Sequence, residues 1–253
     1  MTTAQAILVA AAGVAAGTIN TVVGSGTLIT FPVLLGVGYP PLVANVSNTV
    51  GLVPGSVSGA LGYRGELEGQ GGRVLRMGAA SVAGGIAGAL LLLTLPASAF
   101  KAIVPVLVGL ALVLVVIQPR LAAWLTARQA ADHVRPHHGG PLTRAGIFGT
   151  GVYGGYFGAA QGILLLAILG LTVEEDLQRA NALKNILAGL VNCVSGIVFI
   201  VGGHVAWLPA ALIAGGSVVG GQIGSRVGRR LSRPVLRGVI LVVGIAAIVH
   251  LVA

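Results

Sequence analysis

Long apolar runs without charged residues alternate with short polar gaps along this chain. The first 63 residues contain no Asp, Glu, Lys, Arg or His. A helix rises about 1.5 Å per residue and the hydrocarbon core of a bilayer is about 30 Å thick, so this run could cross a membrane about three times. Further runs without Asp, Glu, Lys or Arg cover residues 77–100, 102–119, 145–173, 185–225 and 238–253. The pattern predicts an all-α, polytopic membrane protein.

Charge, glycine and proline divide these runs into about eight segments long enough to span a bilayer. We place them near Ala4–Val23, Val43–Leu61, Val74–Leu95, Ala102–Ile117, Ala145–Leu169, Ala180–Val201, Trp207–Arg226 and Val235–Leu251. The leftover stretch Leu28–Gly38 is too short to span, and it follows the glycine-flanked segment Gly24–Thr27. We interpret it as the far half of a broken helix or as a re-entrant piece. Ile163–Leu169, which follows Gly158–Gly162, has the features of a counterpart.

The composition agrees with a helical membrane bundle. Only 8% of the residues are charged and 55% are hydrophobic, which leaves too little polar surface for a soluble domain of this size. The 41 glycines favour close helix packing. The low aromatic content, without alternation of apolar and polar positions, argues against an outer-membrane barrel. The single cysteine, Cys193, excludes an intramolecular disulfide and a thiolate metal cluster, and we expect no cofactor.

The formal net charge of +9 indicates lipid contact rather than nucleic-acid binding. The arginines lie in the gaps between apolar runs, where they orient helices and meet anionic headgroups. The gaps around Arg64 and around Arg226 are both basic, yet eight spans would put them on opposite sides of the membrane. The orientation therefore stays open, as does homo-oligomerisation.

The chain repeats itself, which predicts two homologous halves within one transmembrane domain, residues 1–253. Three glycines recur 134 residues later, with Gly17, Gly24 and Gly36 matching Gly151, Gly158 and Gly170. The segment Ala44–Thr49 recurs as Ala180–Asn185. We place the first repeat at residues 1–119, a linker at 120–144 and the second repeat at 145–253. The linker holds His133, His137 and His138, which we interpret as part of a solvated loop rather than as a metal site. An odd number of spans per half would invert one repeat relative to the other, and an even number would keep them parallel.

The membrane interior is polar but carries no carboxylate, because all six Asp and Glu residues lie outside the apolar runs. Broken helices free backbone N–H groups, and the N-terminus of a half-helix attracts anions. Paired breaks in matching places of two repeats point to a transporter's binding site. Lys184 is the one lysine or arginine well inside a span; it could face substrate or extend to the membrane interface. We predict a site for a small anion formed by Asn20, Gly24, Ser25, Gly26, Asn45, Asn48, Thr49, Gln161, Asn181, Lys184 and Asn185.

Several motifs resemble one known family. They are Gly17-x-x-Asn20-x-x-x-Gly24-Ser25-Gly26 running to Pro32, Ala44-Asn45-x-Ser47-Asn48-Thr49, Tyr63-Arg64-Gly65, and Phe100-Lys101-x-x-Val104-Pro105. Together with the echo in the second half, they resemble the TauE/SafE sulfite-exporter family over nearly the whole chain. The resemblance implies an inner-membrane transporter with about eight spans in two repeats, moving sulfite, sulfonates or related small organic acids. It also implies that the two glycine-rich breaks and two asparagine stripes form the anion path. Each stripe shares one helix face at the spacing i, i+3, i+4: Asn45, Asn48 and Thr49 in the first half, and Asn181, Lys184 and Asn185 in the second.

The chain departs from the family pattern at the second break. Leu166 stands where the family usually has proline, Gly158-Ala159-Ala160-Gln161-Gly162 replaces a run of consecutive glycines, and Lys184-Asn185 replaces a smaller pair. Gln161 and Lys184 are therefore candidates for setting substrate choice. An intramembrane enzyme would need a nucleophile with its base, or a metal cluster, and the sequence presents neither. A non-catalytic subunit of a larger membrane complex and a transporter of an uncharged solute remain alternatives.

Overall fold

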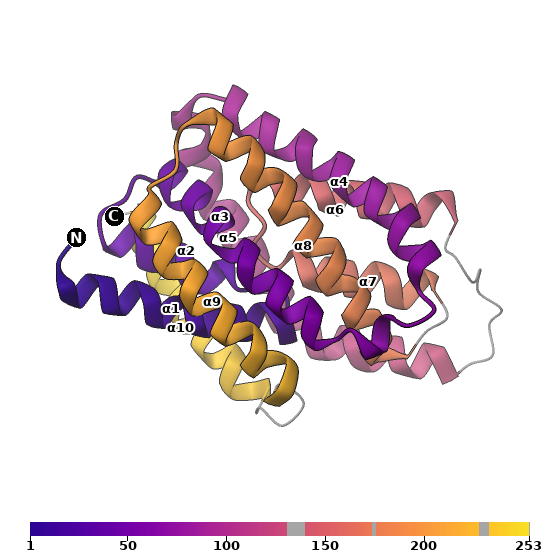
Figure 1. The fold of residues 1–253 in the computed structure, drawn as a ribbon. Helices are drawn as coiled ribbons and strands as arrows, with labels where there is room; N and C mark the ends of the chain where they lie inside the picture. The colour runs from indigo at the N-terminus through magenta and orange to yellow at the C-terminus, as the bar shows by residue number, and fades with distance from the viewer. Residues whose placement is uncertain (131–139, 174–175, 228–232, 253) are drawn as a thin grey trace.

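The computed structural model of the chain describes residues 1–130, 140–173, 176–227 and 233–252, and it confirms the all-α prediction (Figure 1). The described residues form ten α-helices and one short 3-10 helix, η1 (Gly65–Leu67). The helices are α1 (Thr3–Val22), α2 (Thr27–Gly36), α3 (Pro41–Gly62), α4 (Gly71–Thr94), α5 (Ala97–Ala130), α6 (Pro141–Tyr156), α7 (Gln161–Thr172), α8 (Leu177–Gly202), α9 (Trp207–Val227) and α10 (Arg233–Val252).

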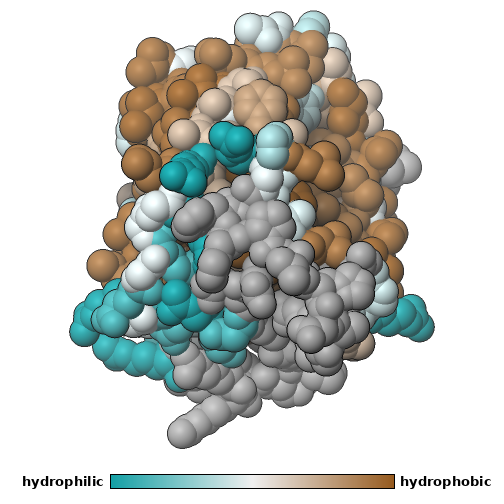
Figure 2. Space-filling model, turned by 90° about the vertical axis from the view of Figure 1, so that its right-hand side faces the viewer, coloured by the Kyte–Doolittle hydropathy of each residue, from teal (hydrophilic) through white to brown (hydrophobic). Residues whose placement is uncertain are grey.

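Several of these helices are suited to a bilayer. Within the described ranges, five combine sufficient length with sufficient hydropathy to span: Thr3–Val22, Gly71–Thr94, Ala97–Trp124, Gln178–Gly202 and Trp207–Arg226. Large apolar side chains also lie on the outside, such as Val201 at 84% and Leu142 at 82% exposure. Figure 2 shows apolar side chains over the upper part and the sides of one face, with a group of hydrophilic ones at its lower left. The chain is a multi-pass membrane protein, but the count of eight spans is not confirmed.

Two predicted boundaries differ in the structure. Helix α5 is 34 residues long and reaches Ala130, so that residues 120–130, assigned to the linker from the sequence, are helical. His133, His137 and His138 lie outside the described residues. The segment Ala145–Leu169, counted as one span from the sequence, is divided into α6 and α7 at the break predicted at Gly158–Gly162. Its break contains two residues with left-handed backbone, Gly158 at φ +76° and Ala160 at φ +60°.

Helices α1 and α9 pack closely and run in the same direction. A Cβ built on Gly13 would lie 2.9 Å from the carbonyl oxygen of Ile213, and one built on Gly17 would lie 2.8 Å from the Cα of Ser217. The contacts advance together along both helices, so the two are parallel. Small residues at the interface permit this approach, as in many membrane bundles.

Helices α4 and α6 form a second pair of the same kind. A Cβ built on Gly151 would lie 2.8 Å from the carbonyl oxygen of Ser81, and one built on Gly155 would lie 3.0 Å from the backbone nitrogen of Ala89. These two helices are parallel as well. Helix α1 thus pairs with α9, and α4 pairs with α6. Each pair joins a helix from the first half of the chain to one from the second half.

The connections between helices gather at two ends of the bundle. At one end, which we call the basic end, Arg179 donates to the Glu68 carbonyl at 3.0 Å, so the α7–α8 connection meets the α3–α4 connection. Arg64 and Arg226 line one pocket there, which brings the end of α9 to the same place. At the opposite end, the Ala206 amide donates to Ser47 Oγ at 2.8 Å, beside the start of α3.

Both broken helices turn back to the end from which they start. Helix α4 begins at the basic end, and α6 is parallel to it, so α6 begins there too. Helix α7 then leads back to the same end, where α8 starts. Helix α1 is parallel to α9, which starts after Ala206, so α1 begins at the opposite end. Helix α2 returns to that end, because Met1 shares a small pocket with Val37, Gly38 and Tyr39. Four helices, α4, α5, α8 and α9, then separate the Arg64 and Arg226 gaps rather than the five predicted spans. An even number of helices thus brings the two basic gaps to the same end of the bundle, whereas eight spans would separate them.

Candidate functional site

The two breaks meet inside the bundle. The backbone N–H of Gly162, in the first turn of α7, donates to the carbonyl oxygen of Gly24 at 3.1 Å. A Cβ built on Gly162 would lie 2.5 Å from the Gly24 Cα, and Gly24 itself has φ +84°. Only glycine satisfies both the close approach and the left-handed backbone. The structure therefore brings the first and second glycine clusters into direct contact.

The polar stripe of α8 reaches the end of α1. Lys184 Nζ donates to the carbonyl oxygens of Asn20 at 3.3 Å and Thr21 at 3.2 Å. Asn185 Nδ2 donates to the Thr21 carbonyl at 3.2 Å, and Asn181 Nδ2 lies 3.5 Å from the same oxygen. The last carbonyls of a helix lack partners within that helix and carry partial negative charge. An ammonium and two amides from another helix thus cap the broken end of α1.

Lys184 is held inside the bundle, which argues against the alternative that its side chain extends to the membrane interface. Its side chain is fully buried. Its Cδ would also lie 3.1 Å from a Cβ built on Gly162. The side chain therefore contacts both breaks, the end of α1 through its ammonium and the start of α7 through its aliphatic stem.

The matching stripe of α3 reaches the other broken helix. Asn45 Nδ2 donates to the carbonyl oxygen of Tyr156, the last residue of α6, at 3.0 Å. Asn48 instead bonds the hydroxyls of Thr27 and Thr30 in α2. Each asparagine-bearing helix thus caps the broken helix that belongs to the other half of the chain.

Within the described chain, the side chains of the remaining predicted residues form no hydrogen bond to the end of a broken helix. Thr49 Oγ1 donates to the carbonyl of Asn45 within its own helix, at 3.0 Å. A Cβ built on Gly26 would lie 2.6 Å from the Ala16 carbonyl oxygen, so this glycine permits α2 to pack against α1. Asn20 takes part through its backbone carbonyl.

Buried polar atoms without partners gather around the junction. Within the described ranges, six buried side-chain nitrogen or oxygen atoms lack a hydrogen-bond partner. Five of them belong to the breaks or to the capping asparagines: Ser25 Oγ, Gln161 Nε2, Tyr156 Oη, Asn45 Oδ1 and Asn181 Oδ1. Buried polar groups are nearly always satisfied, so such a concentration marks a place where a ligand or water can bind. Tyr156 is the one residue of this group that the predicted site omits.

Aromatic rings close one side of the junction. Phe31 and Phe157 meet edge to face with their centroids 5.3 Å apart. Phe100 packs on Tyr156 with the centroids 5.7 Å apart. Phe31, Phe100 and Phe157 are almost fully buried. An apolar wall beside the unpartnered polar atoms keeps the local dielectric low and strengthens their interactions with any bound charge.

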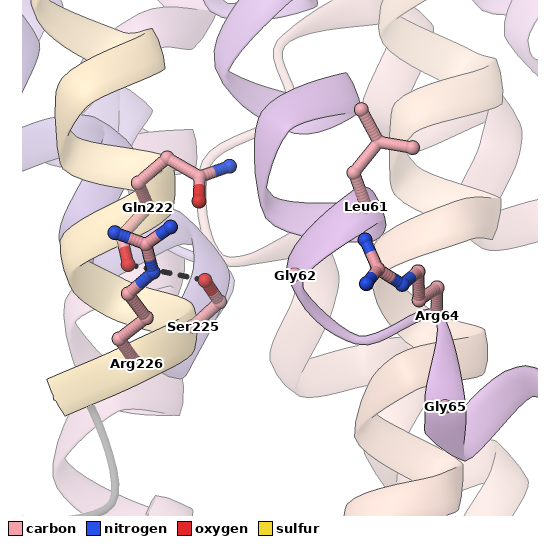
Figure 3. Close-up of a pocket in the computed structure, with 7 residues that line it drawn as sticks. All are labelled: Leu61, Gly62, Arg64, Gly65, Gln222, Ser225 and Arg226. Atoms are coloured by element: carbon pink, nitrogen blue, oxygen red, sulfur yellow. Dashed lines mark hydrogen bonds between the residues drawn. The ribbon is translucent and has the colours of Figure 1, made fainter.

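Two cavities lie between the junction and the basic end. The α3–α8 groove, of about 270 Å³, runs between these helices and is bordered by Asn185, Ser56, Leu61 and Arg64 with mostly apolar neighbours. The Arg64–Arg226 pocket, of about 500 Å³, opens between the ends of α3 and α9 (Figure 3). Of the two asparagine stripes, only Asn185 borders either cavity. No group of three or more His, Cys, Asp or Glu side chains suited to a metal occurs among the residues that the structure describes.

These features define a class: a polytopic helical membrane protein whose two interrupted helices meet in a polar junction, which has no buried Asp or Glu among the described residues. Residues 9–251 match the family model of the sulfite exporter TauE/SafE. The chain belongs to this family of membrane transporters.

Relatives in three bacteria are similar over most of the chain. The probable membrane transporter protein YfcA of Escherichia coli K12 is 27% identical over 229 residues, covering 90% of this chain and 82% of that protein. The probable membrane transporter protein ORF9 of Sinorhizobium is 28% identical over 240 residues, covering 94% and 88%. A probable membrane transporter protein of Haemophilus influenzae is 24% identical over 225 residues, covering 82% and 79%. No solved structure matches the chain.

Proposed function

We propose that this protein is a secondary transporter that carries a small anion, such as sulfite, a sulfonate or a related organic acid, across the cell's inner membrane. The observation that carries the proposal is the direct contact of the two breaks, Gly24 against Gly162, beside buried polar atoms without partners. Interrupted helices are tolerated in a membrane where they are buried in protein or line a cavity, and their ends bind substrates in many transporters.

The charge at the junction favours an anion over a cation. The ammonium of Lys184 is buried there, and the N-termini of α2 and α7 both begin at the breaks. Helix N-termini carry partial positive charge. Ser25 and Gln161 add a hydroxyl and an amide donor that nothing in the described chain occupies.

The helix directions support transport by two inverted repeats. Helices α1 and α3 start at the opposite end, whereas their sequence counterparts α6 and α8 start at the basic end. We infer that each half contributes one hairpin of a broken helix and three crossing helices, an odd number that inverts the second half. Rocking of one inverted half against the other would then expose the junction to each side in turn.

The test is anion flux into proteoliposomes. The purified chain is reconstituted, and uptake of sulfite and of short sulfonates is measured against protein-free vesicles. We expect saturable uptake of at least one of these anions. Replacing Lys184→Met or Asn45→Ala removes hydrogen bonds to a helix end, and each should lower flux about tenfold, as expected for about 1.4 kcal/mol.

The matched control is Asn192→Ala, which removes another amide between helices, bonded to Ser56 Oγ at 3.1 Å but distant in sequence from both breaks. It should retain most of the flux. Transport of uncharged solutes alone, or of nothing in the panel, would refute the anion proposal.

A further inference from the structure

Two arginines border one pocket, and neither has a carboxylate partner among the residues that the structure describes. Arg64 follows α3 and Arg226 lies in the last turn of α9, and both guanidinium groups border the Arg64–Arg226 pocket (Figure 3). Gln222 and Ser225 complete its polar wall, and the Ser225 hydroxyl donates to the Gln222 carbonyl at 3.1 Å. Among the described residues, neither arginine forms an ion pair. Two exposed positive charges therefore border, from its two sides, a cavity of about 500 Å³ that is large enough for a phosphate-bearing headgroup.

An apolar groove continues directly from this pocket. Leu61 and Arg64 line both the Arg64–Arg226 pocket and the α3–α8 groove. The groove is formed largely by apolar side chains of α3 and α8, including Val57, Ala60 and Leu190. Val57 is 47% exposed and Leu61 is 59% exposed, so the groove opens onto the outer surface of the bundle. A cationic compartment thus adjoins an apolar one at the end of α3.

We propose that this paired cavity is a binding site for an anionic phospholipid. The phosphate lies between Arg64 and Arg226, and one acyl chain lies in the α3–α8 groove. Guanidinium groups bind phosphate through paired charge-assisted hydrogen bonds, and basic pockets between membrane helices bind anionic headgroups. A small inorganic anion would satisfy the arginines but would leave the groove beside them uncovered. A phospholipid satisfies both compartments.

The site would connect the surrounding lipid to the junction. Asn185 borders the inner part of the groove, and the same side chain donates to the Thr21 carbonyl at the broken end of α1. An acyl chain in the groove would pack directly against the residue that caps α1. This inference does not depend on which solute the protein transports.

The test is lipid binding by the full-length protein purified in a neutral detergent. Native mass spectrometry is used to measure the affinity for phosphatidylglycerol and for phosphatidylcholine of the same acyl chains. We expect phosphatidylglycerol to bind more tightly. Each of the substitutions Arg64→Gln and Arg226→Gln should weaken its binding about fivefold, because a basic residue near an anionic surface contributes about 1 kcal/mol.

Two further variants distinguish binding at this site from a nonspecific attraction of the anionic lipid to basic residues. Arg76→Gln removes the same charge from the exposed first part of α4, outside both cavities, and should leave the affinity within about twofold of the wild type. Ala60→Phe fills the groove without changing charge and should weaken phosphatidylglycerol binding, and its melting temperature without added lipid verifies that it folds.

Three outcomes would overturn the proposal. One is equal affinity for the two lipids. Another is an equal loss in Arg76→Gln and Arg64→Gln. The third is displacement of the lipid by inorganic phosphate or sulfate, together with full lipid affinity in Ala60→Phe; this would assign the pocket to a free small anion.

Discussion

Gly24 and Gly162 lie back to back where the broken helices meet, and neither position has room for a side chain. The closest contacts that a Cβ would make at either position are with backbone atoms of the other glycine, which cannot move aside as the tip of a flexible side chain can. Both residues belong to the glycine clusters noted in the sequence. That pattern identifies the breaks but not their contact, since a glycine cluster in a membrane helix also serves ordinary close packing.

Gly162→Ala should damage the junction. Its Cβ would lie 2.5 Å from the Gly24 Cα, so the two breaks must separate, and we expect a loss of about 1–3 kcal/mol of stability together with most of the transport. Melting temperature and flux are the measurements. Gly149→Ala is the control, because nothing lies within 4 Å of the added Cβ and alanine favours the helix there. Equal behaviour of the two variants would contradict close contact at the junction.

Ala160 has a left-handed backbone, with φ +60°, immediately before α7. Ala160→Val should lower the stability by about 1–2 kcal/mol or more, because a β-branched side chain is poorly tolerated in this conformation. Ala160→Gly, which adopts it without strain, should fold and transport at least as well as the wild type. Thermal unfolding of both variants in one detergent measures the difference. A valine variant as stable as the glycine variant would argue against the left-handed turn.

At the scale of the helices, the main feature is that α3 and α8 each cap the end of a broken helix from the other half of the chain. The sequence predicts that the polar residues of α3 share a face, as do those of α8, because their spacing is i, i+3, i+4. It could not predict their partners. The carbonyls of Asn20, Thr21 and Tyr156 belong to the backbone, so no side-chain pattern marks them as acceptors. The Lys184 ammonium donates to the Asn20 and Thr21 carbonyls, and a search of the sequence for an acidic partner would miss them.

The close pairs of helices make a prediction at the same scale. Gly88→Val should force α4 away from α6, because a Cβ there would lie 2.8 Å from the carbonyl carbon of Val152 and 2.9 Å from the backbone nitrogen of Tyr156. We expect a loss of about 1–3 kcal/mol, measured by thermal unfolding in detergent. Gly109→Val on α5, where nothing lies within 4 Å, is the matched substitution and should cost less than about 1 kcal/mol. A similar loss in both would show that valine in a helix, rather than helix separation, lowers the stability.

For the whole molecule, hydropathy identifies the membrane segments but not the direction of each one. The run from Ala145 to Leu169 is long enough to cross a bilayer, so the sequence predicts a crossing. In the structure, the left-handed residues Gly158 and Ala160 reverse the chain, and α7 returns to the basic end. With this reversal, four helices rather than five predicted spans separate Arg64 from Arg226. A count of apolar runs cannot detect it, since a hairpin and a span have the same hydropathy.

Cysteine labelling can test whether the Arg64 and Arg226 gaps lie on the same side of the membrane. Cys193 is first replaced by alanine, since it is the only native cysteine, and single cysteines are then introduced as Glu68→Cys, Arg226→Cys, Ala97→Cys and His204→Cys. All four positions are exposed. Glu68 and Arg226 lie at the basic end. Ala97 follows α4 and His204 follows α8, so both lie at the opposite end. The last turns of α4 and α8 meet there, since a Cβ on Gly202 would lie 2.7 Å from Leu93 Cδ1.

A membrane-impermeant maleimide applied to intact cells should label Ala97→Cys and His204→Cys, and it should label Glu68→Cys and Arg226→Cys only after the membrane is opened. We expect this direction because the basic end carries an excess of arginine, and the loops of membrane proteins that are rich in Lys and Arg generally face the cytoplasm. Because the comparison is between pairs, the result is decisive even if the protein inserts the other way round. Labelling of Glu68→Cys and Arg226→Cys from opposite sides would restore the odd number of crossings. It would then remove the inverted arrangement on which alternating access at the junction depends.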